Sequence, residues 1–442
     1  MSLLSESILK DVVLKKLIDD EKTSRLENET AQNHKICLQI LETLYSRKDF
    51  ENFLKLFEYL TQRRSQSRES IIKMVKYCLE TVLKNLPDEE SVKKLLECII
   101  KVTDGKIFVE LQYSQAVRKM AEIHLNHQDY CSAAKLIQDV QIEAFGSLER
   151  DYKVEYILFQ MDVLIKNNDY IRTLIVSNKI HRKNLDDKGF ELLKTQFYQL
   201  LIKYYLHEKK YLDVSKYFKV LYDYVKEVNE KLAKVEKQEI NEEPRILEHL
   251  ITIKRDNSLQ TLFQNYVLFL SICPPELETV NMFNELKISY KKELDSDKYI
   301  RDLVHQRLSD EILSINDAYF NPYLSYDIFK SDATLLTLFR KYTIQHNISL
   351  FEKFFSKIHL KRIAQLINVP ENEVEQEIAD MVVHNFIYAK INRLEGIVNF
   401  KKSTDYHDII DDINCDLSSM LKNLEQTCHL INKEYLKYKI EN

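Results

Sequence analysis

The feature that most constrains the fold is a short turn followed by an aromatic residue, which recurs along the chain at a nearly constant interval. Asp129-Tyr130, Asp169-Tyr170 and Lys210-Tyr211 follow one another at almost equal spacing, and Asp49-Phe50 lies two such periods earlier. The intermediate turn is expected at 87–90. Each turn interrupts apolar residues at helical spacing. A helix–turn–helix unit repeated at this period predicts an α-solenoid, because neither helix can hide its apolar face without stacked neighbours.

One repeat shows the expected packing in detail. Its first helix precedes the turn at 167–169, and Tyr152, Ile157, Met161 and Leu164 recur on one face of it. The partner helix after the turn is expected to pack through the face formed by Ile171, Leu174, Ile175 and Asn178.

Scarcity of turn residues supports a helical chain. Only four glycines and six prolines occur in 442 residues, about 1% each against usual values of ~7% and ~5%. A β-protein of this size would need many more. The formal net charge of −5, from 64 basic and 69 acidic residues, indicates no global attraction to nucleic acid.

Cysteine usage and hydropathy indicate the compartment. The seven cysteines form no C-x-x-C pair and their number is odd, which predicts buried free thiols in a reducing compartment. No charged-then-apolar leader opens the chain. The longest apolar stretch, around 266–273, is too short to span a bilayer. We therefore expect a soluble protein of the cytoplasm and nucleus that makes no membrane contact.

A change of periodicity marks residues 358–400. A short helix over 360–367 ends before Pro370, and a second helix is predicted over 371–384. After it, apolar and polar residues alternate on both sides of a turn at 392–396, which predicts a β-hairpin. Helix, turn, helix and hairpin together predict a winged helix, a module that binds either nucleic acid or protein.

The charges of this module favour protein. Residues 371–389 contain five acidic residues and no Lys or Arg, so this helix would be repelled by DNA. The basic cluster at 63–68 has no aromatic residues to stack bases and is interpreted as solvated surface. The hairpin offers an edge strand that could pair with a neighbouring subunit. The predicted interface residues of the hairpin are Ile387, Tyr388, Ala389, Lys390, Ile397, Val398, Asn399 and Phe400.

A nearly heptad apolar stripe follows in residues 405–438. A helix of about 34 residues would be roughly 50 Å long. Its stripe must be buried either against the solenoid or in a bundle with helices of other chains. The predicted bundle residues are Ile413, Leu417, Met420, Leu421, Leu424, Ile431 and Tyr435.

Motifs of catalysis are not found. The sequence contains no H-E-x-x-H, G-x-S-x-G, P-loop or Rossmann pattern. His124 and His127 could share a metal, but only Asp129 lies nearby, so two surface residues beside a turn are the favoured interpretation. Cys428 belongs to the apolar stripe and is expected to serve packing. We therefore predict no enzyme activity and no catalytic, cofactor-binding or metal site.

Several ordered blocks carry a resemblance. They lie at 105–110, 140–147, 169–173, 191–194 and 346–348 and in the hairpin at 387–400. With the predicted solenoid, winged helix and final helix, they resemble the PCI domain, which is shared by scaffold subunits of the proteasome lid, the COP9 signalosome and translation initiation factor three. The amino-acid sequences of these blocks are similar to those of a subunit of the 26S proteasome lid.

The resemblance implies a non-catalytic scaffold in a hetero-oligomer. Its winged helix would pack beside those of other lid PCI subunits, and its last helix would join a bundle. The N-terminal solenoid would reach the ATPase base or core particle, and the lid would hold the metal-dependent deubiquitinating subunit pair. The alternatives are signalosome PCI subunit four and, from another class, a nucleic-acid-binding winged-helix protein.

The predicted class is all-α: a solenoid of TPR-like helix pairs that continues into a winged-helix (PCI) domain with a small β-hairpin and a long C-terminal helix. Residues 226–257 are expected to be an exposed helix end, a loop or a partly disordered charged insertion in the solenoid, and 316–332 a loop. The expected segments are the solenoid at 1–257, the helical part of the PCI domain at 258–355, the winged helix at 356–402 and the bundle helix at 403–442.

Overall fold

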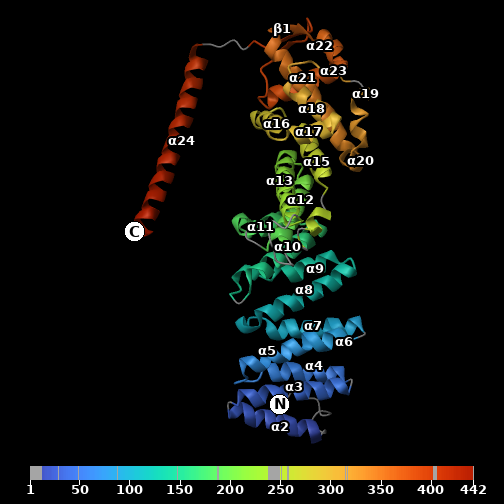
Figure 1. Ribbon diagram of the computed structural model, residues 1–442, viewed down its shortest axis with the longest axis vertical. Coiled ribbons are helices and arrows are strands. Elements are labelled where there is room, and N and C mark those ends of the chain that lie inside the picture. The colour runs from blue at the N-terminus through green and yellow to red at the C-terminus, as the bar shows by residue number, and fades with distance from the viewer. Residues whose placement is uncertain are drawn as a thin grey trace. The chain divides into compact units, whose positions relative to one another are not determined.

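In the computed structural model the chain forms two compact units, Met1–Phe263 and Gln264–Asn442 (Figure 1). The residues that it describes are 12–441, without 28, 48, 87, 147, 187–188, 237–248, 250, 256–257, 314, 316 and 402–405.

Unit 1 is a stack of antiparallel helices, most of which contact the helices next to them in the sequence or one place further on (Figure 1). Repeated packing of this kind confirms the predicted solenoid. The helices are α2 (Val12–Leu26), α3 (Thr30–Ser46), α4 (Phe50–Thr61), α5 (Arg68–Tyr77), α6 (Leu83–Asn85), α7 (Glu89–Thr103), α8 (Glu110–Asn126), α9 (Tyr130–Gln138), α10 (Arg150–Lys166), α11 (Tyr170–Ser177), α12 (Glu191–His207) and α13 (Tyr211–Glu236), with α15 (Leu259–Ser271) crossing the division.

The recurring turns begin helices as predicted, and their chemistry is the same in three of them. An aspartate precedes the aromatic residue and caps the new helix by accepting a hydrogen bond from a main-chain N–H. The cap is made by Asp49 on Asn52, by Asp129 on Ser132 and by Asp169 on Arg172, with N–O distances of 3.2 to 3.4 Å. The fourth turn, before Tyr211, lacks the aspartate. It shares with the two turns before it a left-handed residue two places before the aromatic one, at Gln128, Asn168 and Lys209.

One detail of unit 1 differs from expectation. Helix α11 contacts α10 and α12 and buries Thr173 and Ser177, whereas Ile171 and Ile175 are 79% and 58% exposed. The buried face of α11 is thus the one that carries the two small hydroxyl residues. The expected packing face of α11 is therefore wrong.

The charged stretch at 226–257 begins as the end of a helix, which is one of the structures expected for it. Helix α13 runs to Glu236 and buries Val228 and Leu232, which lie one helical turn apart on one face. Residues 237–248, 250 and 256–257 of this stretch lie outside the described residues.

Unit 2 contains a helical part, a small sheet and a final helix. The expected loop at 316–332 is wrong, because much of it is short helix that packs Phe320, Tyr323 and Phe329 around Phe339 with ring centroids 5.4 to 5.6 Å away. The elements are α16 (Leu277–Ser289), α17 (Lys291–Ser296), α18 (Lys298–Leu308), α19 (Asp317–Phe320), α20 (Asp327–Ser331), α21 (Ala333–Phe354), β1 (Lys357–His359), α22 (Leu360–Ile367), α23 (Glu371–Val383), β2 (Lys390–Asn392), β3 (Ile397–Asn399) and α24 (Tyr406–Glu441).

Polar side chains hold the helical part of unit 2 together. Arg307 of α18 is half-buried and donates to the main-chain oxygens of Ser271 and Tyr342 at 3.2 and 3.1 Å, and loss of solvent around the guanidinium lowers its pKa. Asn347 of α21 exchanges two hydrogen bonds with the main chain of Leu313, at 2.8 and 3.0 Å. The block 346–348, which carried part of the resemblance, therefore has a structural role in this unit.

Candidate assembly surfaces

The hairpin predicted from the sequence belongs to a three-stranded antiparallel sheet in the order β1-β3-β2. In the registers, Val398 of β3 lies opposite Ile358 of β1 on one side and Ile391 of β2 on the other. The hairpin is confirmed, but β1 was missed. So short a strand beside a helix gives too little alternation to be recognised, and its partner β3 comes only after both helices of the winged helix and β2.

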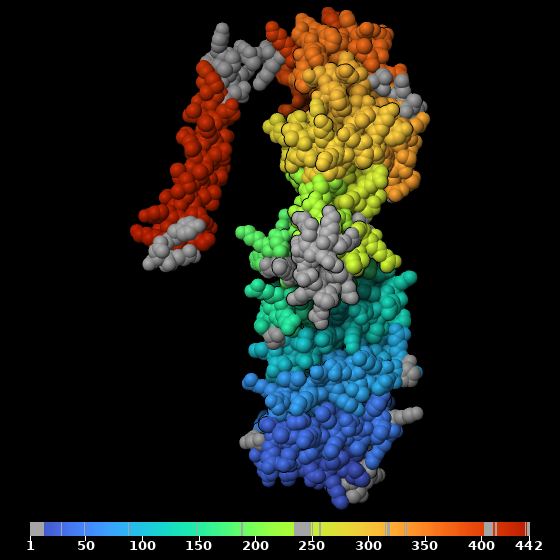
Figure 2. Space-filling model, viewed as in Figure 1, coloured from blue at the N-terminus to red at the C-terminus, as the bar shows by residue number. Residues whose placement is uncertain are grey.

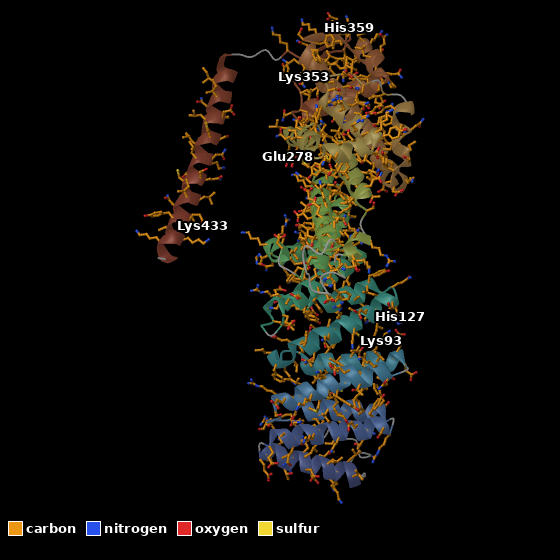
Figure 3. The ribbon with its side chains drawn as sticks, viewed as in Figure 1. Lys93, His127, Glu278, Lys353, His359 and Lys433 are labelled. Atoms are coloured by element: carbon orange, nitrogen blue, oxygen red, sulfur yellow. The ribbon has the colours of Figure 1, made fainter. Side chains whose placement is uncertain are left out.

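The two faces of this sheet differ in chemistry. Ile358 and Val398 point into unit 2 and are buried. Because successive side chains alternate, the opposite face carries one row formed by Lys357, Asn399 and Lys390, which we call the basic row. A second row beside it consists of His359, Ile397 and Asn392, and Figure 3 labels His359 at this end of unit 2. The outer face therefore presents lysine and amide groups without a carboxylate.

The predicted interface residues of the hairpin divide into core and surface. Ile387, Val398 and Phe400 are buried and support the sheet from within. Lys390 is exposed, and its ammonium lies 5.7 Å from the Tyr388 ring centroid. Ala389, Ile397 and Asn399 are half-buried. Since β3 is the central strand, the edge on the hairpin side is β2, and it is Lys390–Asn392 that could extend the sheet.

The acidic residues of α23 are mostly engaged inside unit 2. Lys341 of α21 lies 2.8 Å from Asp380 and 3.9 Å from Glu377, which also accepts from Gln345 at 2.9 Å. Burial, the largest cause, raises the pKa of Glu377, while Gln345 and Lys341 lower it.

Two further ion pairs complete this arrangement. Arg340 lies 3.5 Å from Glu373, and Arg393 of the turn after β2 lies 2.7 Å from Glu375. The acidic face of α23 thus fixes the helix against α21 and the hairpin. A recognition helix needs an outward face with cations, and α23 has neither Lys nor Arg.

Helix α24 is exposed on every side. Every side chain of α24 that the structure describes is exposed, including Leu417 and Leu424 at 56% each. Figure 2 draws this helix in red as a space-filling surface. Its predicted bundle residues all lie on this helix, and Ile413, Met420, Leu421, Ile431 and Tyr435 are 58% to 67% exposed. A stripe of large apolar side chains in water is costly, at about 1.5–3 kcal/mol for each one that could be buried.

The histidine pair in unit 1 is engaged separately. His127, labelled in Figure 3, lies 2.7 Å from Glu89 of α7, while His124 lies 3.7 Å from Asp129. Across the described residues, no group of three or more His, Cys, Asp or Glu is arranged to hold a metal. None of the described helices is both long and apolar enough to cross a membrane.

Comparison with known proteins gives two family matches. Residues 12–231 match the family model described as PSMD12/CSN4, N-terminal, and residues 289–402 match the PCI domain. These matches cover most of the solenoid and all of the sheet.

Curated relatives match along almost the whole chain. The 26S proteasome non-ATPase regulatory subunit 12 of Dictyostelium discoideum is 26% identical, covering 97% of this chain and 90% of its own length. The 26S proteasome regulatory subunit RPN5 of Saccharomyces cerevisiae is 25% identical, with 97% and 92% covered. For homolog A of the non-ATPase regulatory subunit 12 in Arabidopsis thaliana, identity is 25% and both coverages are 97%. The chain belongs to the PSMD12/CSN4 family of PCI-domain proteins.

Proposed function

We propose that this chain is a structural, non-catalytic subunit of the lid of the proteasome regulatory particle, equivalent to regulatory-particle non-ATPase subunit five. The observation that supports this most is similarity over nearly the full length to proteins named as 26S proteasome regulatory subunits. The family model at the N-terminus is shared with signalosome subunit four, so the full-length relatives favour the lid.

Helix α24 is the part of the chain that requires partners. Its apolar stripe repeats at intervals of three and four positions and is exposed, which is the pattern of a helix that packs against other helices. In the proposed lid, Ile413, Leu417, Leu424 and Ile431 enter a bundle formed with the C-terminal helices of other subunits.

The sheet of the winged helix provides a second interface with a neighbouring subunit. The β2 edge offers main-chain groups for pairing, and the basic row beside it favours a neighbour that presents carboxylates. Through these two surfaces the chain contacts other lid PCI subunits. It thereby positions the metal-dependent deubiquitinating subunit pair without cleaving ubiquitin itself.

The remaining assignments follow from this role. As the resemblance to lid subunits implies, the N-terminal solenoid contacts the ATPase base or core particle, and the stacked helices of unit 1 offer surface for such a contact. The protein binds no nucleic acid or membrane, needs no cofactor, and works in the cytoplasm and nucleus, where proteasomal degradation of ubiquitinated proteins takes place.

Purification of the tagged full-length chain with mass spectrometry tests the proposal. A lid subunit should bring down the proteasomal ATPases and the other lid subunits in near-equal amounts. Cullins and their modifying enzymes in place of ATPases would indicate the signalosome instead. Sub-micromolar binding of the purified chain to RNA or duplex DNA at physiological salt would contradict the protein-scaffold interpretation.

A further inference from the structure

Two segments of unit 1 that carried the family resemblance, 105–110 and 140–147, meet at one cavity. The cavity has a volume of about 300 Å³ and lies between the turn after α7 and the turn after α9. Ile107, Tyr113, Asp139 and Phe145 are among its lining residues. Neither the ion pairs of the winged helix nor the stripe of α24 involves this region.

The cavity has an aromatic wall and an apolar rim. The Tyr113 and Phe145 rings pack edge to face, with centroids 6.4 Å apart and an angle of 67° between the planes. Ile107 is 75% exposed at the rim, although a residue of this type is usually covered. Gly105 has φ +71°, a backbone conformation that strains other side chains, and it turns the chain so that Ile107 faces outward.

The charge at the cavity is mainly negative. Asp104 and Asp139 line it, are exposed, and form no ion pair with any of the residues placed in the structure. Both carboxylates lie close enough to Tyr113 to raise the pKa of its phenol, after burial as the largest cause. The one lysine in the lining, Lys106, is directed elsewhere, since its ammonium donates to the Thr61 carbonyl oxygen at 3.5 Å.

We propose that this cavity binds a lysine or arginine side chain from an extended segment of a partner protein, with an apolar neighbour of that residue resting on Ile107. The carboxylates of Asp104 and Asp139 attract a cation through their charge, and the Tyr113 and Phe145 rings of the lining offer apolar contact to the long side chain that carries it. The same carboxylates repel phosphate, which disfavours nucleic acid as the occupant. This binding does not depend on the lid assignment, because it uses unit 1 alone.

Fluorescence anisotropy of labelled peptides with the purified full-length chain tests the proposal. The probe is fluorescein-Gly-Gly-Leu-Arg-Leu-Gly, and the matched peptide has Glu in place of Arg. We expect the Arg peptide to bind at least tenfold more tightly than the Glu peptide, and its binding to weaken from about 50 to about 500 mM salt.

Variants at exposed positions identify the site without disturbing the fold. Asp104→Asn with Asp139→Asn should weaken binding of the Arg peptide at least fivefold. Glu97→Gln with Glu230→Gln removes two exposed carboxylates elsewhere in unit 1 and should leave it unchanged. Ile107→Ser should weaken binding twofold or more while retaining the preference for Arg. Equal binding of the two peptides, or full binding by the Asp104/Asp139 variant with an unchanged melting temperature, would overturn the proposal.

Discussion

The small sheet and helix α24 both follow the helical part of unit 2 in the sequence, but the sheet buries its large apolar residues and α24 exposes them. The sheet buries Val398 and Phe400 within its own unit and keeps lysines on its outer face. Helix α24 leaves Leu417, Leu424 and their neighbours in water. Substitutions in the sheet should therefore lower the stability of the isolated chain, whereas substitutions in α24 should lower its affinity for partner subunits.

The largest effect is expected from charges on the stripe of α24. Leu417→Asp with Leu424→Asp should weaken assembly at least 100-fold, because two carboxylates would have to enter an apolar bundle. The melting temperature of the isolated chain should stay unchanged, since both side chains are already exposed. Size-exclusion chromatography with partner subunits and circular dichroism measure the two quantities.

A matched variant controls for added charge. Ser419→Asp with Gln426→Asp places two carboxylates on the opposite face of the same helix and should assemble normally. Collapse of the isolated Leu417/Leu424 variant on heating would show that α24 packs within its own chain, which would remove the contrast with the sheet.

The opposite result is expected in the sheet. Val398→Pro removes a main-chain donor and a buried side chain from the central strand, so it should destabilise the isolated chain by about 4 kcal/mol or more. Val398→Ala keeps the donor and should cost about 2–3 kcal/mol. Urea unfolding monitored by circular dichroism measures both. An unchanged unfolding midpoint for Val398→Pro, with only assembly lost, would mean that β3 serves the interface rather than the fold.

The elements of the fold differ in how well the sequence predicts them. The boundaries of α22 and α23 could be predicted because Pro370 and the change of period are local signals. The solenoid turns could be predicted because each aspartate caps its own helix within a single turn. Strand β1 could not, because its only evidence is pairing with β3, which lies beyond α22, α23 and β2 in the chain.

The same limit applies to contacts between distant elements. The acids of α23 are visible in the sequence, but their pairing with Arg340, Lys341 and Arg393 is not, because these cations lie on other elements. Ile171 is exposed while Thr173 is buried, and helical periodicity alone does not show which face of α11 packs against its neighbours. The cavity beside Tyr113 joins two turns that α8 and α9 separate in the chain, and it carries no local motif.

A smaller, pH-dependent effect is expected from His346, which lies in the polar network of unit 2. Burial, aided by Arg307 and Lys353, lowers the pKa of its ring to about 4, while a hydrogen bond to the Gln306 main chain and Asp310 oppose this. In the unfolded chain the pKa of His346 is near its ordinary value of 6.5, so between pH 6.5 and pH 4 the unfolded state binds more protons than the folded state. Stability should therefore decline by about 2–3 kcal/mol between pH 6.5 and pH 4 and should be unaffected by this group above that range.

The variant His346→Gln isolates this contribution. Subtracting its free energy of unfolding from that of the wild type at each pH removes the other titrating groups, and the difference should slope between pH 6.5 and pH 4. A flat difference would show that His346 is protonated in the folded chain as easily as in the unfolded one. Residues of α24 are exposed, so the slope should be the same in a chain that carries Leu417→Asp.

The smallest expected effect on stability comes from single ion pairs, and it should differ between a partly buried pair and an exposed one. Lys341 is about one-third exposed and faces Asp380 and Glu377, so Lys341→Met should cost about 1 kcal/mol, and less at about 1 M salt. Lys353 pairs with Asp310 at 3.1 Å, but both side chains are more than 60% exposed, so Lys353→Met should have no measurable effect in urea unfolding. Equal costs for the two variants would mean that the acidic face of α23 does not fix this helix. The carboxylates of α23 would then be free to bind partner proteins, as the exposed apolar stripe of α24 is.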